Sequence, residues 1–319
     1  MDTLYFLVQQ MMPYTIPLLV VAIGGMFSER SGVVNIALEG TMVMGAFAGT
    51  LTIHLLQKSG VMSGMPLLFV GLLVSMIVGI IYASLHAIAS INMMADQTIS
   101  GTALNLFAAA FSIFISRSIL GYQQIPFLNQ FFITKVPLLG DLPIIGPMFF
   151  QKTYILNLIG IIILILAQIV LFKTRFGLRL RSAGEFPQAT DAAGVSVIKM
   201  RYAGVLISGA LSGMGGLIYI IPVSTVFDGS VAGYGFLAVA VLIFGQWKPK
   251  SVALAALFFG FLKTISAAYQ GIPFLSGLGI PGVVYKILPY FVTIIILFLT
   301  SKKSAAPASL GEPFDKGKR

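Results

Sequence analysis

Cysteine is absent from the chain, and charged residues are scarce. Without Cys among the 319 residues, disulfide bonds, thiol catalysis and thiolate metal sites are excluded. Charged residues make up 9% of the chain, whereas soluble domains carry about 25%. A chain this poor in charge has the composition of a protein that resides in lipid.

Motifs of several catalytic and energy-coupling classes are missing as well. No HExxH, GxSxG or GxxxxGK[ST] stretch is present, so zinc hydrolases, serine hydrolases and an internal ATPase have no support. Ion-driven carriers usually hold carboxylates or histidines deep in their spans, but His54 and His86 fall near the ends of predicted spans. Lys263 and Lys286 have no evident carboxylate partner. We expect no catalytic residue, no metal site and no cofactor, and any energy for transport would come from another subunit.

Long apolar runs recur along the whole chain. Hydrophobic residues make up 57% of it, and the mean hydropathy is +0.97. Runs of about 20 apolar residues match a helix that crosses a ~30 Å hydrocarbon core, and the run 154–172 lacks the alternation of a membrane β-strand. We therefore predict an all-α, polytopic transmembrane bundle over residues 1–301. Eight to ten spans fit the pattern, and the nine preferred spans are 4–27, 34–56, 66–88, 101–120, 153–172, 202–221, 232–247, 251–269 and 284–300.

Positive charge is concentrated in three segments. Six Lys and Arg lie in 173–201, two are Lys248 and Lys250, and five follow Ser301, which together make thirteen of the 20 in the chain. Alternating spans place these segments on one side of the membrane, and the positive-inside rule makes that side cytoplasmic. The formal charge of +10 is thus explained by topology and needs no nucleic-acid partner. The small, polar tail 302–319 is expected to be disordered.

Small residues recur at every fourth position in three predicted spans. In lipid, close packing through such faces is a principal source of helix association. Helix packing alone accounts for these stripes. A further role would be to let the packed helices slide past each other between two conformations. The stripes are Ala37, Thr41, Gly45 and Gly49; Gly204, Ser208, Ser212 and Gly216; and Ala256, Gly260, Thr264 and Ala268.

Two polar clusters lie near the starts of predicted spans. Asn35 and Glu39 are four residues apart and share a helix face, and Gln97 and Asn105 belong to the second cluster. Helix capping and interhelical hydrogen bonds explain both clusters, because unpaired polar groups are costly in lipid. The alternative is a polar substrate pathway formed by these four residues, with Phe107 as a stacking surface.

The basic loop 173–201 has a nearly uncharged middle with helix signals. Pro187 suits the first turn of a helix, because its missing N–H needs no partner there. Gly194 is a good stop signal, and Ser196 can cap the helix that leads into the next span. We therefore predict a short helix over 187–193.

Four stretches resemble one family of transport proteins. GEFPQATDAAGVSVIKMRY (184–202) is similar to the cytoplasmic coupling segment of ABC importer permeases that serve branched-chain amino acids, simple sugars and nucleosides. FSERSGVVNIALEGTMVMGAF (27–47), ADQTISGTALNLFAAAF (95–111) and GYGFLAVAVLIFGQWKP (233–249) resemble the same family. Within the stretch 27–47, the pattern SERSG followed by NIALEG is similar to the nucleoside and simple-sugar branch.

The resemblance implies the permease subunit of an importer in a bacterial inner or plasma membrane, with 173–201 and the C-terminus in the cytoplasm. Its partners would be the lipid bilayer, a cytoplasmic ABC ATPase, a second related permease in a heterodimer, and an extracytoplasmic binding lipoprotein or periplasmic protein. Nucleosides are the expected substrate, simple sugars are the alternative, and an ion-coupled secondary transporter is the alternative of another class. ATP hydrolysis would belong to the ATPase, whose closure would push the coupling segment 182–196 and tilt the spans. Within that segment, the residues that would sit in a groove of the ATPase are Gly184, Glu185, Phe186, Pro187, Ala189, Asp191, Ala192 and Gly194.

Overall fold

Helices make up most of the chain, as the apolar runs predict. The computed structural model describes residues 2–136, 139–141, 143, 146–269, 277, 279–300, 305–315 and 317. The helices are α1 (Asp2–Arg30), α2 (Leu38–Lys58), α3 (Gly64–Ala87), α4 (Gln97–Leu120), α5 (Ile155–Lys173), α6 (Arg175–Glu185), α7 (Pro187–Ala192), α8 (Val197–Val223), α9 (Tyr234–Phe244), α10 (Pro249–Ala268) and α12 (Gly282–Thr300). The strands are β1 (Ile125–Pro126), β2 (Phe132–Lys135), β3 (Gln151–Tyr154) and β4 (Val226–Phe227).

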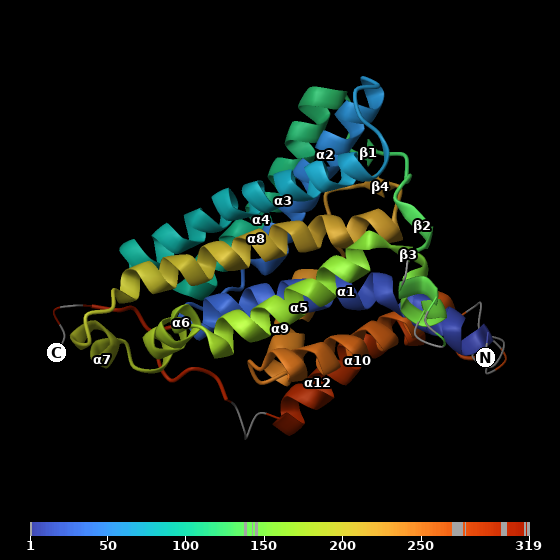
Figure 1. The fold of residues 1–319 in the computed structure, drawn as a ribbon. Helices are drawn as coiled ribbons and strands as arrows, with labels where there is room; N and C mark the ends of the chain where they lie inside the picture. Colours follow the sequence, from blue (N-terminus) through green and yellow to red (C-terminus); the bar gives the residue numbers. More distant parts are fainter. Residues whose placement is uncertain are drawn as a thin grey trace.

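Helix α8 lies in the middle of the bundle (Figure 1). α1, α2 and α3 pack directly against it, and α10 packs against α1. The short helix α7 lies at one end of the bundle, beside the C-terminus, whereas the four strands gather at the other end, on the side of the N-terminus (Figure 1). We call these the α7 end and the strand end.

Six helices in the described part of the chain are long and apolar enough to cross a membrane. The expected count of nine complete spans is therefore not confirmed. The predicted span 232–247 forms only α9, whose 11 residues extend about 16 Å, roughly half of a hydrocarbon core. The predicted span 34–56 becomes helical only at Leu38. Both departures come from breaks in the helices, which a hydropathy pattern does not reveal.

The small-residue stripes let helices approach closely, as predicted. A Cβ built at Gly45 of α2 would lie 2.1 Å from the carbonyl oxygen of Gly213 in α8. A Cβ at Gly216 would lie 2.0 Å from the carbonyl oxygen of Met42. Side chains larger than hydrogen at these positions would push α2 and α8 apart, so the stripes set the spacing at the centre of the bundle.

Short strands and side chains tie the loops together at the strand end. β1 pairs with β4 and β2 pairs with β3, both antiparallel. His54 at the end of α2 donates from Nδ1 to the carbonyl oxygen of Pro126 (2.7 Å). Gln57 donates to the carbonyl oxygen of Leu128 (2.8 Å) and accepts from its N–H (3.0 Å). The loop that follows α4 is therefore anchored on α2.

Candidate functional site: the helix junction and the α7 end

The segment between α1 and α2, residues 31–37, runs inside the bundle without forming a helix. Asn35 is 1% exposed and donates from Nδ2 to Ser208 Oγ at 2.8 Å. Ser208 lies eleven residues after Val197, the first residue of α8, which is about 16 Å along the helix. α2 therefore begins near the middle of the bundle and not at the α7 end.

Side chains of α3 and α4 provide the hydrogen bonds of this segment. Gln97 Oε1 accepts from the Val34 N–H (2.7 Å), and His86 Nε2 donates to the Val34 carbonyl oxygen (2.9 Å). Asn105 accepts from the Gly40 N–H (2.7 Å) and donates from Nδ2 to the Ile36 carbonyl oxygen (2.9 Å). Irregular backbone is tolerated at membrane depth where protein buries and satisfies it. These four bonds are therefore what permits α2 to start inside the bundle.

Glu39 joins the start of α2 to the start of α9. Its Oε1 accepts from the Gly233 N–H (3.0 Å) and its Oε2 accepts from the Gly235 N–H (2.6 Å). Glu39 also occupies the first turn of α2. Helix N-termini carry unpaired N–H groups and partial positive charge. The single Glu39 carboxylate therefore neutralises two helix N-termini, those of α2 and α9. We call residues 31–37, with Glu39, Asn105, Gly233 and Gly235, the helix junction.

Helix α9 leads from the junction to the α7 end. Trp247, just beyond α9, donates from Nε1 to Glu29 Oε2 (2.6 Å). Its carbonyl oxygen accepts from Arg30, the last residue of α1. α2 and α9 thus begin together in the middle of the bundle and run to opposite ends, which is the arrangement of discontinuous helices found in many transporters.

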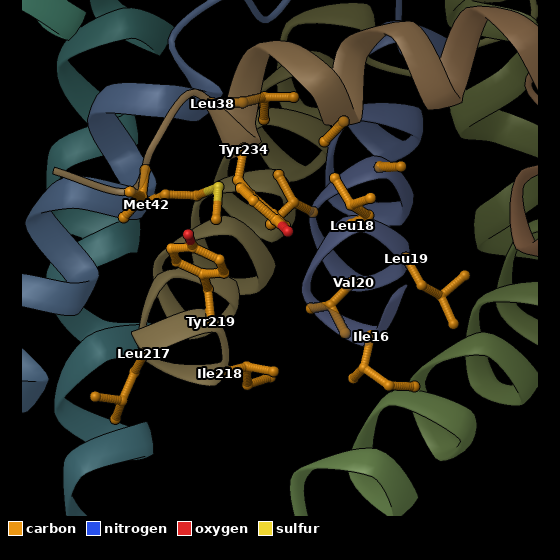
Figure 2. Packing of buried hydrophobic residues seen from close by; sticks show 14 of the residues in the cluster. Ile16, Leu18, Leu19, Val20, Leu38, Met42, Leu217, Ile218, Tyr219 and Tyr234 are labelled. Carbon is orange, nitrogen blue, oxygen red and sulfur yellow. The ribbon is translucent and has the colours of Figure 1, made fainter. Parts of the chain in front are cut away.

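Aromatic rings and one lysine surround the start of α9. The ring centres of Tyr219 and Tyr234 are 4.0 Å apart, and Figure 2 shows the two rings facing each other within the apolar packing. Lys263 Nζ lies 5.3 Å from the Tyr234 ring centre and 4.7 Å from the Tyr290 ring centre. It also donates to the Tyr290 hydroxyl at 3.1 Å. The rings of Tyr234 and Tyr290 therefore stabilise the ammonium group of Lys263, which lies inside a spanning helix.

The five residues predicted for a substrate pathway make different contacts. Asn35, Gln97 and Asn105 hold the junction backbone, and Glu39 caps α9. These contacts are the capping and interhelical bonding by which the sequence explains both clusters, with the substrate pathway as the alternative. Phe107 is 52% exposed and stacks on its α4 neighbour Phe111 at 5.3 Å between ring centres. A part for any of the five in substrate transfer stays a prediction.

The short helix predicted in the basic loop is present as α7. Pro187 is its first residue. Gly194, two residues after its end, has φ +80°, a conformation that glycine adopts without strain. Ser196 accepts from the Lys199 N–H and caps α8. The start signal, the stop signal and the cap all act as the sequence predicts.

The segment 184–194 is partly buried and partly exposed. A Cβ at Gly184 would lie 2.4 Å from the Arg30 carbonyl oxygen, so this glycine packs on the end of α1. Pro187 is buried too. Phe186, by contrast, is 62% exposed and borders a cavity of about 280 Å³ shared with Ala189. The other residues predicted to contact an ATPase are exposed or half-buried: Glu185, Asp191, Ala192 and Gly194.

The C-terminal tail packs on the α7 end. The Ser309 N–H donates to the Gly184 carbonyl oxygen (2.9 Å). Arg201, 1% exposed, donates from Nη1 to the Glu312 carbonyl oxygen (2.8 Å). The described residues of the tail 302–319 thus have defined contacts, although the composition of the tail predicts disorder. The contacts are made largely by the main chain, so the polar side chains of the tail gave no sign of them.

The whole chain was compared with known protein families. A family model described as the permease component of branched-chain amino acid transport systems matches residues 7–297. The chain belongs to this family. The permease is 42% identical to NupQ, a guanosine ABC transporter permease protein of Bacillus subtilis, over 96% of its own length and 95% of NupQ. It is 41% identical to NupC, a nucleoside ABC transporter permease protein of Lactococcus lactis, over 99% of both chains. It is also 26% identical to NupP, a guanosine ABC transporter permease protein of Bacillus subtilis, over 92% of its length and 80% of NupP. No solved structure matches the permease.

Three of the four stretches that resemble the family meet at the helix junction of the permease. The stretch 27–47 contributes the break and Glu39, and 95–111 contributes Gln97 and Asn105. The stretch 233–249 contributes the two N–H groups that Glu39 binds. Three of the four stretches therefore contribute residues to the junction, and the fourth forms the α7 end.

Lys263 and the tyrosines around it were not among the predicted site residues. Tyr219, Tyr234 and Tyr290 come from three helices, and no spacing in the sequence brings them together. One signal was present: Lys263 is a charged residue inside the predicted span 251–269, and such residues usually mark functional positions.

Proposed function

We propose that the permease imports nucleosides as the membrane subunit of an ATP-binding-cassette transporter. One observation carries the substrate: NupQ and NupC, named for guanosine and for nucleosides, share 42% and 41% of their residues with the permease over almost its entire length. The chemistry of the junction agrees with a neutral substrate. Glu39 already neutralises the helix ends that could otherwise attract an anion.

A separate ATPase drives transport by pressing on the α7 end. Phe186, exposed beside a cavity that borders α7, supports this docking role, because exposed aromatic residues at pockets are frequent anchors of protein interfaces. Glu185 transmits the push, since it accepts from Arg30 at the end of α1 (3.3 Å) and from the Ala308 N–H of the tail (3.2 Å). The α7 end faces the cytoplasm, as its concentration of Lys and Arg supports.

The permease works beside a second, related permease and receives its substrate from an extracytoplasmic binding protein. The names of NupP and NupQ support the pair, since both are guanosine permease proteins of Bacillus subtilis. The strand end, where the loop that follows α4 is anchored on α2, would face that binding protein.

Reconstitution in proteoliposomes tests the proposal. The permease would be combined with candidate ATPase, second-permease and binding-protein subunits, and uptake of radiolabelled guanosine and glucose would be measured with and without ATP. We expect guanosine uptake that requires both ATP and the ATPase. Uptake that follows an ion gradient without the ATPase would contradict the ABC mechanism, and ATP-dependent uptake of glucose but not guanosine would contradict the substrate.

A further inference from the structure

A cavity of about 330 Å³ lies between the start of α9 and α12, next to the helix junction. Its volume falls in the range of small-molecule sites. Gly233 lies at the junction side of this cavity, and the rings of Phe236 and Tyr290 line it. Both rings are about half exposed (52% and 46%). The cavity therefore offers two aromatic surfaces beside the point where the helices break.

Two residues of the cavity lining are bonded to groups of opposite charge that are not themselves part of the lining. The Gly233 N–H is bonded to Glu39 Oε1 (3.0 Å). A Cβ at Gly233 would lie 4.0 Å from the Tyr290 hydroxyl, and that hydroxyl accepts from Lys263 Nζ (3.1 Å). A carboxylate and an ammonium thus each lie one residue behind the cavity lining, at Gly233 and at Tyr290. Helix packing alone does not require this pair, and charged groups in spanning helices are otherwise rare.

A buried hydroxyl without a partner lies in the same cluster. Tyr234 is 1% exposed, and its hydroxyl makes no hydrogen bond in the described part of the chain. Its ring lies under Lys263 and against Tyr219. An unpaired buried hydroxyl is unfavourable, and a polar ligand or a water molecule that enters the cluster would pair with it.

The chemistry of the cavity selects an uncharged aromatic ligand with hydrogen-bonding edges. Glu39 and Lys263 offset each other, so neither an anion nor a cation is favoured overall. A carboxylate or phosphate would meet Glu39, and an ammonium group would meet Lys263. Aromatic faces bind flat rings by stacking, and the charged pair can bind the donors and acceptors of a heterocycle. A nucleobase combines these properties, whereas a sugar lacks the flat aromatic face.

We propose that this cavity, the base cavity, binds the nucleobase of the substrate during its passage through the permease. The base stacks on Tyr290 and Phe236, and its polar edge faces Lys263 and Glu39. This assignment rests on the proposed nucleoside import. It gives the permease a selectivity step of its own, in addition to that of the binding protein.

Uptake by variants of the assembled transporter provides the first test. Lys263→Met keeps the length of the side chain and removes the charge, and Lys286→Met on α12 is the matched control, because Lys286 is an exposed lysine of another predicted span. Loss of a hydrogen bond to a charged group lowers the affinity for a ligand by about 10- to 100-fold. We expect Lys263→Met to lower ATP-dependent guanosine uptake by that factor, while Lys286→Met takes up guanosine at the wild-type rate. Wild-type uptake by Lys263→Met would overturn the proposal.

Protection from chemical modification provides a test that does not depend on the stability of Lys263 variants. The chain has no cysteine, so Thr293→Cys introduces a single thiol into the lining of the base cavity and leaves both stacking rings in place. We expect N-ethylmaleimide to modify this thiol and guanosine, but not glucose, to slow the modification. Modification that guanosine does not slow would mean a lipid-facing surface, and no modification in the assembled transporter would mean a cavity covered by the second permease. Either result overturns the base cavity.

The two proposals can fail separately. If the wild-type transporter carries no nucleoside, the proposed function falls and the base cavity falls with it. If wild-type transport of guanosine is intact but Lys263→Met and the protection assay give the contrary results, only the base cavity is wrong.

Discussion

The helix junction and the α7 end are held together in different ways. At the junction, side chains from distant helices bind broken backbone, and the participating groups are largely buried. At the α7 end, the segment 184–194 is held by contacts with the tail and by the partly exposed ion pair of Arg30 with Glu185. Buried polar networks resist change because breaking them leaves unpaired groups, whereas exposed pairs contribute little. We infer from this difference that the junction is a fixed point and that the α7 end is the part able to move.

The largest effect is expected at the spacing between α2 and α8. Gly45→Ala places a methyl group 2.1 Å from the Gly213 carbonyl oxygen, and the backbone of α8 cannot yield to it without moving. Overpacking of this kind costs about 1–3 kcal/mol or more, and we expect a clear fall in the thermal unfolding midpoint in detergent. Ala110→Val adds more volume at an exposed position of α4 and should leave that midpoint unchanged. Equal midpoints for Gly45→Ala and the wild type would show that the helices are not held at this distance.

Removal of the junction carboxylate should have the next largest effect. Glu39→Ala leaves the N–H groups of Gly233 and Gly235 buried without acceptors, at about 1–3 kcal/mol for each unpaired group. Glu39→Gln keeps one acceptor oxygen but loses the charge, so its unfolding midpoint should lie between those of Glu39→Ala and the wild type. If Glu39→Gln is as unstable as Glu39→Ala, charge and not hydrogen bonding holds the junction.

An exposed anchor at the α7 end should affect assembly without affecting the fold. Phe186→Ala removes a ring that is 62% exposed, so the unfolding midpoint of the isolated permease should hardly change. Interface anchors contribute about 2 kcal/mol or more, and we expect co-purification with the ATPase to weaken by at least about tenfold. Leu178→Ala on α6, with Leu178 61% exposed, is the matched control. A similar loss with Leu178→Ala would mean that the docking surface extends beyond α7.

The smallest effect is expected from the tail. Ser309→Pro removes the N–H that donates to the Gly184 carbonyl oxygen, whereas Ser309→Ala retains it. One such bond contributes about 0.5–1.5 kcal/mol. Proteolysis at the α7 end should therefore be faster in Ser309→Pro than in Ser309→Ala, with little difference in global unfolding. Identical proteolysis of the two variants would show that the tail does not hold the coupling segment.

The sequence predicts the local features of the permease well, because their causes are local. Pro187, Gly194 and Ser196 act through the conformations and hydrogen bonds of their own neighbours. The shortness of α9 was open in the sequence, because the polar residues and glycines of 222–247 also fit a broken or re-entrant helix. The break before Leu38 was not predicted, because the hydrogen bonds that satisfy its backbone come from residues far away in the sequence.

For the same reason, the sequence indicated only some of the residues of the candidate site. Glu39 and Asn105 stand out as polar residues in apolar spans, and both prove to build the junction. Tyr234 and Tyr290 do not stand out, since tyrosine in a spanning helix usually packs or lies at an interface. Only the fold brings their rings to Lys263.

Distances between spin labels give the most direct test of the claim that the α7 end moves around a fixed junction. The cysteine-free chain permits labels at chosen pairs, Ser63→Cys with Ala193→Cys across the bundle and Ser63→Cys with Leu106→Cys beside the junction; all three positions are exposed. When an ATP analogue closes the ATPase, we expect the first distance to change by about 5 Å, the scale of a one-turn movement, and the second by less than about 2 Å. Equal changes in the two distances, or a change confined to the second, would contradict the account.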